Sequence, residues 1–440
     1  MKNMTVNELH ELFLKSNGIT TDSRKCGPGL IFFALKGERF DGNSFAGQAL
    51  DMGCMAAVTD SEEYYDSSDS RMILVDNVLK SLQELARFHR DWLKVPVIGI
   101  TGTNGKTTTK ELIHAVMSKS YRTLATKGNL NNQIGVPLTL LELNESHQYA
   151  VIEMGASHPG DIMELVNISN PDYGIITNVG KAHLLGFGSF EGVKATKGEL
   201  YGFLRAKGGK IFLNAENTHL TEMARGLDSI NYGKPGTAGV SIQGELICCN
   251  PCLKFRWRRT ECSEWHQVQT NLIGSYNLDN ALAAITIGLH FGVPEEKATA
   301  AIEEYIPMNN RSQLTKTERN SLVVDAYNAN PTSMQAALEN FSLMEATGKM
   351  LILGDMRELG DSSQEEHARI TNLIKSLGFT DVFLIGEEFR KANAATQAGF
   401  RTFIDTTEMA GFIRESAISG KTILIKGSNS MKLFTLTELL

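Results

Sequence analysis

The 440-residue sequence predicts an α/β protein of three domains. One observation is its length, because a single hydrophobic core stops growing at about 250–300 residues. The other is a series of short apolar runs, such as VIGIT, that end in small or polar residues and lead into helical patterns. Continuous apolar strands that alternate with helices are typical of parallel sheets covered on both faces.

The predicted strands follow one another along the chain. They are LIFFAL near the start and then, from Val97 onward, VIGIT, YAVIEMGA, YGIITNVG, KIFLNAEN, SLVVDAYNAN, MLILGDM, DVFLIGEE and TILIKGSN. A helix, TTTKELIHAVMSK, follows VIGIT, and three-and-four spacing marks its buried stripe as Leu112, Ile113, Val116 and Met117. Ligands gather at the carboxyl ends of parallel strands, where the polar residues of these runs lie.

Two changes in composition suggest the domain boundaries. The acidic stretch SEEYYDSSDS precedes a helical pattern, VLKSLQELARFHRDWL, which leads into the strand at Val97. Further on, Pro307 and paired asparagines in YIPMNNRSQL interrupt a helix that ends near Tyr305. The predicted domains are therefore residues 1–94, 95–308 and 309–440.

Composition excludes several classes of protein. A formal net charge of -7 argues against the basic surface that nucleic-acid binding requires. No apolar run approaches the roughly 18 residues of a membrane helix. Glu8, His10 and Glu11 interrupt the first apolar residues, which argues against a signal peptide. Six cysteines are too sparse for a disulfide scaffold. We expect a cytoplasmic, water-soluble monomer.

One group of cysteines allows two interpretations. Cys249, Cys252, Cys262 and His266 have the spacing C-x2-C-x9-C-x3-H, which could be a zinc site. The alternative is β-structure, because the intervening LKFRWRR alternates apolar and basic residues. Short cysteine motifs arise easily by chance, so β-structure is favoured.

The stretch VIGITGTNGKTTTK has the order of strand, glycine loop and helix that cradles phosphates. Backbone N–H groups at Gly102 and Gly105 would surround phosphate oxygens at the helix N-terminus. Lys106 would reach the β- and γ-phosphates, and the Thr107 hydroxyl would bind Mg2+. The strict G-x4-G-K pattern is not met, since its first glycine falls at Ile100. The predicted nucleotide-binding residues are Thr101, Gly102, Thr103, Asn104, Gly105, Lys106, Thr107 and Thr108.

Three side chains after the next apolar runs could complete a metal site. Glu153 ends the strand YAVIE, where a carboxylate can face the phosphate loop. His183 follows the next strand and could be a second ligand. Lys197 would be repelled by Mg2+ unless its amine has reacted with carbon dioxide to form a carbamate. Lys194, nearby in GVKATKGELY, could be confused with it, and either could be an ordinary surface lysine.

These motifs together resemble the Mur ligase family, the ATP-dependent amide-forming enzymes of peptidoglycan precursor synthesis. The resemblance runs through nearly the whole chain, in TGTNGKTTTK, GNLNNQIGVPLTLL, EMGASHPGDI, TNVGKAHLLGFGS, GSYNLDNALAA, DAYNANPTSM and GDMRELG. It implies a central P-loop domain with a parallel sheet and a C-terminal Rossmann-like domain that closes over ATP. It also implies that the N-terminal domain binds a UDP-linked substrate.

Within the family, the chain is most similar to the member that joins D-alanyl-D-alanine to UDP-N-acetylmuramoyl-tripeptide. The segments that carry this likeness are DSRKCGPGLIFFALKGERFDGNSF, DAYNANP and GDMRELG. The implied mechanism is phosphorylation of the tripeptide carboxylate by ATP. The dipeptide amine then attacks the acyl phosphate, giving an amide, ADP and phosphate.

The resemblance also assigns roles to particular residues. It implies that Lys106 and Thr107 hold the phosphates and a first Mg2+, to which Glu153 is also a ligand. It also implies that His183 and carbamylated Lys197 bind a second Mg2+. The implied contacts to adenine, γ-phosphate and ribose are Asn277, Asn280, Arg311 and Asp325. Asn277 could also cap a helix, alone or together with that contact. The family often has glycine before Arg311, where this chain has Asn310. The implied substrate contacts are Ser23 and Arg24 for the uridine nucleotide, Asn131 and Asn132 for the muramoyl-peptide, and Asn328 and Asn330 for the dipeptide.

Two rival functions stay open at this point. One is another amide ligase of the superfamily, either the tripeptide-forming Mur enzyme or a folylpolyglutamate synthase. The other is a switch ATPase that hydrolyses ATP under the control of a protein partner and makes no amide. The carboxylate, histidine and lysine after the strands supply more metal ligands than a switch needs, which favours the ligase.

Overall fold

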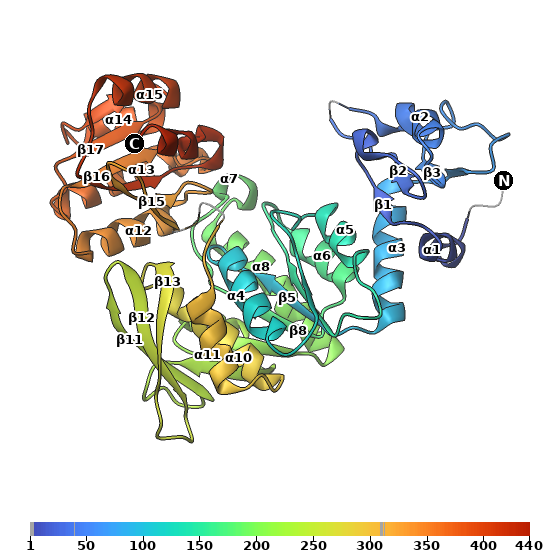
Figure 1. The fold of residues 1–440 in the computed structure, drawn as a ribbon, viewed down its shortest axis with the longest axis horizontal. Coiled ribbons are helices and arrows are strands. Elements are labelled where there is room, and N and C mark those ends of the chain that lie inside the picture. The colour runs from blue at the N-terminus through green and yellow to red at the C-terminus, as the bar shows by residue number, and fades with distance from the viewer. Residues whose placement is uncertain (1–3, 39, 309–310, 312) are drawn as a thin grey trace.

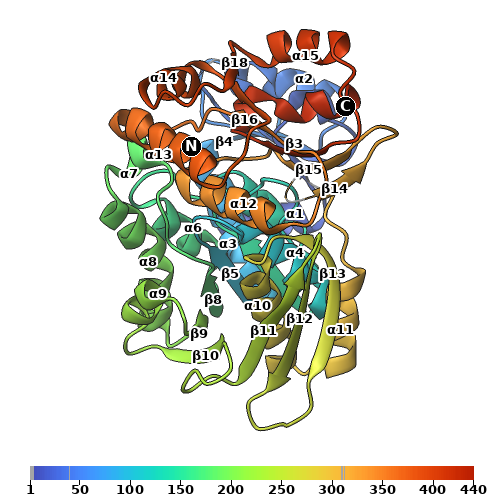
Figure 2. The same cartoon turned by 90° about the vertical axis from the view of Figure 1, so that its left-hand side faces the viewer.

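The computed structural model describes residues 4–38, 40–308, 311 and 313–440, which form three sheets of four, nine and six strands. Parallel strands dominate each sheet, which confirms the predicted α/β class. Figure 1 shows the first unit (blue) and the third (orange to red) apart from each other, each resting on the second. Figure 2 shows both at the same end of the second unit. Each sheet lies inside one predicted range, but the exact boundaries stay predictions, and Asn309 and Asn310 lie outside the described residues.

The first unit is a small parallel sheet with strand order β1-β2-β3-β4. Its core strand, β2, is wholly buried, and helix α3 covers the sheet with Val78, Leu82 and Leu85. Helix α3 also packs against α5 and α6 of the second unit and so joins the two units. The elements are α1 (Val6–Leu14), β1 (Ile19–Thr20), η1 (Ser23–Lys25), β2 (Ile31–Phe33), η2 (Gly42–Phe45), α2 (Ala46–Asp51), β3 (Ala56–Thr59), β4 (Met72–Leu74) and α3 (Val78–Leu93).

The second unit has the strand order β13-β12-β11-β10-β9-β8-β5-β7-β6, with antiparallel pairing only from β11 to β13. Its strands are β5 (Val97–Thr101), β6 (Thr123–Ala125), β7 (Tyr149–Glu153), β8 (Tyr173–Ile176), β9 (Lys210–Asn214), β10 (Asp228–Gly233), β11 (Ile242–Cys249), β12 (Cys252–Arg259) and β13 (His266–Ile273). Its helices are α4 (Lys106–Ser118), α5 (Gly135–Leu140), α6 (Asp161–Ser169), α7 (Leu184–Phe187), α8 (Phe190–Lys207), α9 (Thr218–Met223), α10 (Asn277–His290) and α11 (Glu295–Glu304).

The register of the second sheet decides where its polar residues meet. Strand β5 lies between β7 and β8, with Ile100 opposite Glu153 and Thr101 opposite Ile176. The carboxyl ends of these three parallel strands therefore share one edge. Helix α4 packs over this region through its predicted stripe, whose four apolar residues are fully buried.

The third unit has the order β14-β15-β19-β16-β17-β18, with only β14 antiparallel. Strands β15 and β19 are parallel neighbours, and their last residues, Asp325 and Lys426, are register partners. The elements are β14 (Gln313–Lys316), β15 (Ser321–Asp325), α12 (Pro331–Leu343), β16 (Lys349–Gly354), η3 (Gly360–Ser362), α13 (Ser363–Ser376), β17 (Val382–Ile385), α14 (Glu387–Ala395), β18 (Arg401–Phe403), α15 (Thr406–Glu415), β19 (Thr422–Lys426), η4 (Asn429–Met431) and η5 (Leu433–Glu438).

The cysteine segment adopts β-structure. Leu253, Phe255 and Trp257 on β12 are fully buried, in the alternation that the sequence predicted. His266 stacks on Trp257, and its Nε2 lies 2.8 Å from a Glu295 carboxylate oxygen. In the described part of the chain, no three His, Cys, Asp or Glu side chains are grouped as a metal site. Within that same part, no helix has the length and apolarity to cross a membrane.

Candidate active site

The loop between β5 and α4 has the shape of an anion cradle. Helix α4 begins at Lys106, so its first N–H groups face the loop. Gly105 has φ +80°, and a Cβ there would lie 2.8 Å from the Asn280 side-chain oxygen. A side chain at residue 105 would therefore be strained and would collide with α10. This is why the loop needs glycine where the backbone turns toward the cavity.

Lys106 lies across the mouth of this cradle. Its Nζ donates to the carbonyl oxygens of Gly102 (2.7 Å) and Thr103 (3.2 Å). Burial lowers the pKa of the Lys106 amine to about 8, against the opposing attraction of the Glu153 carboxylate. A partly buried cation whose hydrogen bonds go only to neutral carbonyl groups is poised to bind an anion, because the anion supplies a further opposite charge.

Glu153 stands at the end of β7 with only 1% of its surface exposed. Its Oε1 accepts from the Thr107 hydroxyl (3.1 Å) and from Asn131 Nδ2 (2.9 Å). Its other oxygen, Oε2, is buried and has no hydrogen-bond partner within the described residues. A buried carboxylate with a free oxygen is costly unless a cation or donor satisfies it. Carboxylate and hydroxyl oxygens together suit a hard cation such as Mg2+.

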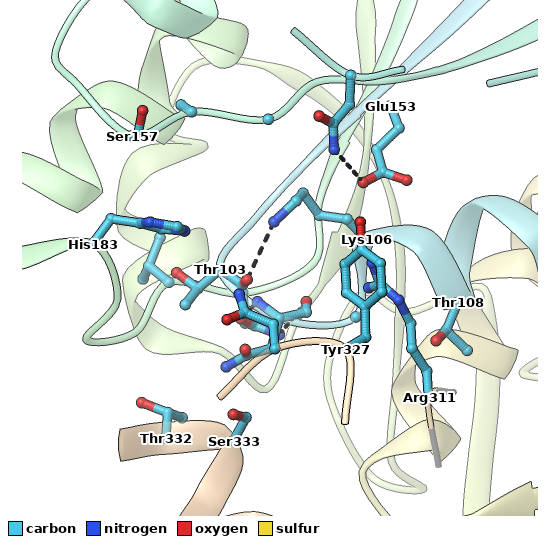
Figure 3. A pocket seen from close by; sticks show the side chains of 18 of the residues that line it. Thr103, Lys106, Thr108, Glu153, Ser157, His183, Arg311, Tyr327, Thr332 and Ser333 are labelled. Carbon is cyan, nitrogen blue, oxygen red and sulfur yellow. Dashed lines mark hydrogen bonds between the residues drawn. The ribbon is translucent and has the colours of Figure 1, made fainter. Parts of the chain in front are cut away.

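One cavity of about 560 Å³ collects most of the predicted residues (Figure 3). It lies between the second and third units, at the carboxyl ends of β5, β7 and β15. The predicted residues that line it are Thr103, Asn104, Gly105, Lys106, Thr108, Asn131, Asn132, Glu153, His183, Asn277, Asn280, Arg311, Asp325 and Asn328.

Five predicted residues lie just behind the cavity wall. Thr101 is buried at the end of β5, and a Cβ on Gly102 would lie 2.0 Å from the Thr177 hydroxyl. Thr107 is buried against Glu153. Asn330 donates to Asn104 (2.7 Å) and caps α12 by accepting from the Ser333 N–H (2.9 Å). The fifth residue is Lys197.

Lys197 is a buried amine with 3% exposure on α8. Its Nζ makes a long, 3.5 Å hydrogen bond to the carbonyl of Ala156, which lines the cavity, and lies 5.4 Å from the Phe187 ring centroid. Burial, helped by the charge of Lys106, lowers the pKa of Lys197 well below its usual value. Lys194 instead pairs with Glu222 at 2.5 Å on the outer side of the helix. The structure thus separates the two lysines that the sequence left open to confusion.

The third unit contributes a cluster that sequence analysis only partly found. Asp325 accepts from Nζ of Lys426 at 2.6 Å, and this lysine, 1% exposed, also donates to the carbonyl of Asn328 (3.1 Å). The Arg311 guanidinium stacks 3.9 Å from the Tyr327 ring centroid. Lys426 and Tyr327 were missed, as were Thr332 and Ser333 of α12, although all four line the cavity. A signal for Lys426 existed, because it ends an apolar strand as Glu153 does.

Two expectations about individual side chains need comment. The proposed helix cap at Asn277 is wrong: α10 begins at Asn277, and its side chain donates to the carbonyl of Ile273 (2.8 Å).

Arg24 lies away from the cavity on η1 and pairs with Asp22 at 2.8 Å, its side chain 87% exposed. Ser23 precedes it on the same turn. Both belong to the first unit and do not line the cavity.

Comparison with known proteins decides the family. Three family models match the chain, described as "Mur ligase family, catalytic domain" (residues 15–90), "Mur ligase middle domain" (100–288) and "Mur ligase, glutamate ligase domain" (310–429). A UDP-N-acetylmuramoyl-tripeptide--D-alanyl-D-alanine ligase from Bacillus subtilis is 36% identical over 95% of this chain and 91% of its own length. The chain belongs to the Mur ligase family.

Other Mur ligases agree with this assignment. The ligase of the same name from Escherichia coli is 33% identical over 96% of this chain and 93% of its own. A crystal structure of MurF from Acinetobacter baumannii, 29% identical, superposes with a TM-score of 0.87 over 100% of this chain and 98% of that one. MurF from Thermotoga maritima in complex with ADP has the same fold, with a TM-score of 0.85 at 24% identity over 98% and 97% of the two chains.

Proposed function

We propose that this Mur ligase joins D-alanyl-D-alanine to UDP-N-acetylmuramoyl-tripeptide at the expense of ATP. The terminal carboxylate of the tripeptide attacks the γ-phosphorus, and ADP leaves. The amine of the dipeptide then attacks the acyl-phosphate carbonyl, the amine loses a proton, and phosphate leaves. This reaction is a step of peptidoglycan precursor synthesis, and its use of ATP and a UDP-linked substrate favours a cytoplasmic location.

The observation that carries this proposal is that one cavity between the second and third units gathers residues from both. Gly105, Glu153 and His183 all line it, together with Arg311 and Asp325 from the far side. A nucleotide bound there touches both units, so their approach would exclude water from the acyl phosphate. Water exclusion matters because hydrolysis of the acyl phosphate would waste ATP without forming an amide.

We assign the nucleotide contacts by position. The N–H groups at the start of α4 and the Lys106 amine would hold the phosphates, and Asn277 and Asn280 the adenine. Asp325, held by Lys426, would accept from the ribose hydroxyls, and Arg311 would meet the γ-phosphate. Catalysis is then mainly positioning and neutralisation of charge, as expected for phosphoryl transfer.

The residues present fit magnesium. Thr107 and Glu153 would hold a first ion, since a free carboxylate oxygen lies beside a hydroxyl. His183 and carbamylated Lys197 would hold a second, and the lowered pKa of Lys197 shifts this amine toward the neutral form from which a carbamate forms. When bound, Mg2+ would offset the negative charge of the phosphates.

The substrate contacts follow the three units. In this proposal residues 1–94 bind the uridine nucleotide through Ser23 and Arg24. Residues 95–308 bind ATP, with Asn131 and Asn132 at the muramoyl-peptide, and residues 309–440 close over ATP and bind the dipeptide near Asn328 and Asn330. A long UDP-linked substrate would lie across the first and second units and place its carboxylate in the cavity.

Mass spectrometry of the reaction products tests the proposal. The protein is incubated with Mg-ATP, UDP-N-acetylmuramoyl-tripeptide and D-alanyl-D-alanine, and we expect one pentapeptide product for each ADP released. Parallel reactions contain glutamate with a folate, or ATP alone. An amide formed only with glutamate and the folate, or ADP released with no amide in any mixture, would refute the assignment.

A further inference from the structure

The GDMRELG motif contains a residue whose role the proposed function leaves open. Within this motif, Asp355 caps α14 by accepting from the N–H groups of Glu388 (3.2 Å) and Phe389 (2.9 Å). The Arg357 N–H donates to the Ser428 hydroxyl (2.9 Å). These contacts stay inside the third unit. Glu358 instead faces the second unit, where its carboxylate is in ion-pair contact with Nδ1 of His183.

Backbone strain is present on both sides of this contact. His183 has φ +50° and Glu358 has φ +64°, the left-handed region that residues other than glycine rarely adopt. The Glu358 carbonyl also accepts from the N–H of Leu185 (3.2 Å), so one residue holds the start of α7 at two points. Strained conformations of this kind persist where the surroundings impose them, and they cluster at functional sites.

Stability alone does not account for the pair. The Glu358 side chain is 60% exposed and the His183 side chain 31%, and solvent-exposed ion pairs contribute little to folding. Another ion pair between the units lies close by, where Lys181 meets the largely buried Glu366 at 2.7 Å. The contact at His183 is therefore not needed to hold the two units together. What it does determine is the orientation of the imidazole ring.

We propose that Glu358 is a positioning residue that orients His183 for the reaction from across the interface between the second and third units. A carboxylate at Nδ1 keeps the proton on that nitrogen and leaves the Nε2 lone pair to face the cavity that His183 lines. The ring is then correctly set only when the units are docked. Docking of the third unit thereby completes the site beside the phosphate loop. This inference rests on the proposed function, because it assigns His183 a part in that reaction.

The test compares Glu358→Gln and Glu358→Ala with Glu365→Gln, a matched change at an exposed glutamate on α13. We expect both Glu358 variants to lower kcat by about 10–100-fold, the usual cost of losing a carboxylate behind a functional histidine. The KM for ATP and the melting temperature should stay near wild type, as should every property of the control. In a His183→Ala background, Glu358→Gln should have no further effect on kcat.

A second readout does not depend on turnover. Nitrogen-15 NMR of the His183 ring should show a proton fixed on Nδ1 in the wild-type protein and a mixture of tautomers in Glu358→Gln. Unchanged ring signals, or an equal loss of kcat with and without His183, would overturn the role of Glu358. Failure of the wild-type protein to make the amide would refute the proposed function instead, and the ring signals would still report on the pair.

Discussion

Replacing Lys106 with alanine is expected to lower turnover by several orders of magnitude while leaving the fold intact. The amine is the partly buried cation of the phosphate cradle. Its loss removes positive charge from the place where negative charge develops during phosphoryl transfer. The fold should tolerate the change because Nζ bonds only to two loop carbonyls, of Gly102 and Thr103. Steady-state kinetics at saturating substrate and thermal melting measure the two effects.

A matched control for this variant lies at the other end of the same helix. Lys119 caps α4 and pairs with Glu304 at 2.5 Å, away from the cavity. Lys119→Ala should keep wild-type turnover. Near-normal activity of Lys106→Ala would remove the phosphate-loop assignment, and melting at a much lower temperature would show that Lys106 stabilises the fold.

The second large effect is expected at Lys197. Lys197→Ala should lower kcat by more than about 100-fold, since loss of a direct metal ligand should exceed the 10–100-fold typical of outer partners. Small carboxylates such as acetate should partly restore activity, because they can supply the oxygen atoms of the lost carbamate. Activity measured against carboxylate concentration, with and without bicarbonate for the wild-type protein, gives the result.

Lys194→Ala is the control for chemical rescue. Lys194 lies three residues earlier on the same helix but forms an ion pair with Glu222. This variant should lose little activity and should not respond to carboxylates. If carboxylates also fail to restore the activity of Lys197→Ala, Lys197 is unmodified in the wild-type protein. The proposed second metal site would then lose a ligand.

The phosphate loop and Glu153 could be predicted from local sequence rules, whereas the other lining asparagines, Arg311 and Asp325 came from the family resemblance. Glu153 was found because it ends an apolar strand, and strand order then brought its carboxylate to the phosphate loop. Gly105 was found from the spacing of its loop. Such predictions succeed because the carboxyl ends of neighbouring parallel strands meet at one edge, whatever the rest of the chain does.

Contacts between units could not be predicted in the same way. The meeting of His183 with Glu358 depends on how two separately folded sheets dock, and on left-handed backbone at both residues. Nothing in local periodicity encodes either feature. Lys426 was missed for a different reason: its strand was predicted, but a lysine ending a strand gave no sign that Asp325 would be its register partner.

Transfer of oxygen from the tripeptide carboxylate to phosphate tests the central claim most directly. The tripeptide is labelled with oxygen-18 at its terminal carboxylate, and the phosphate released during synthesis is analysed by mass spectrometry. Attack of that carboxylate on the γ-phosphorus predicts one labelled oxygen in each phosphate, matched to each amide formed. Amide formation with unlabelled phosphate would contradict the acyl-phosphate route and the purpose assigned to this cavity.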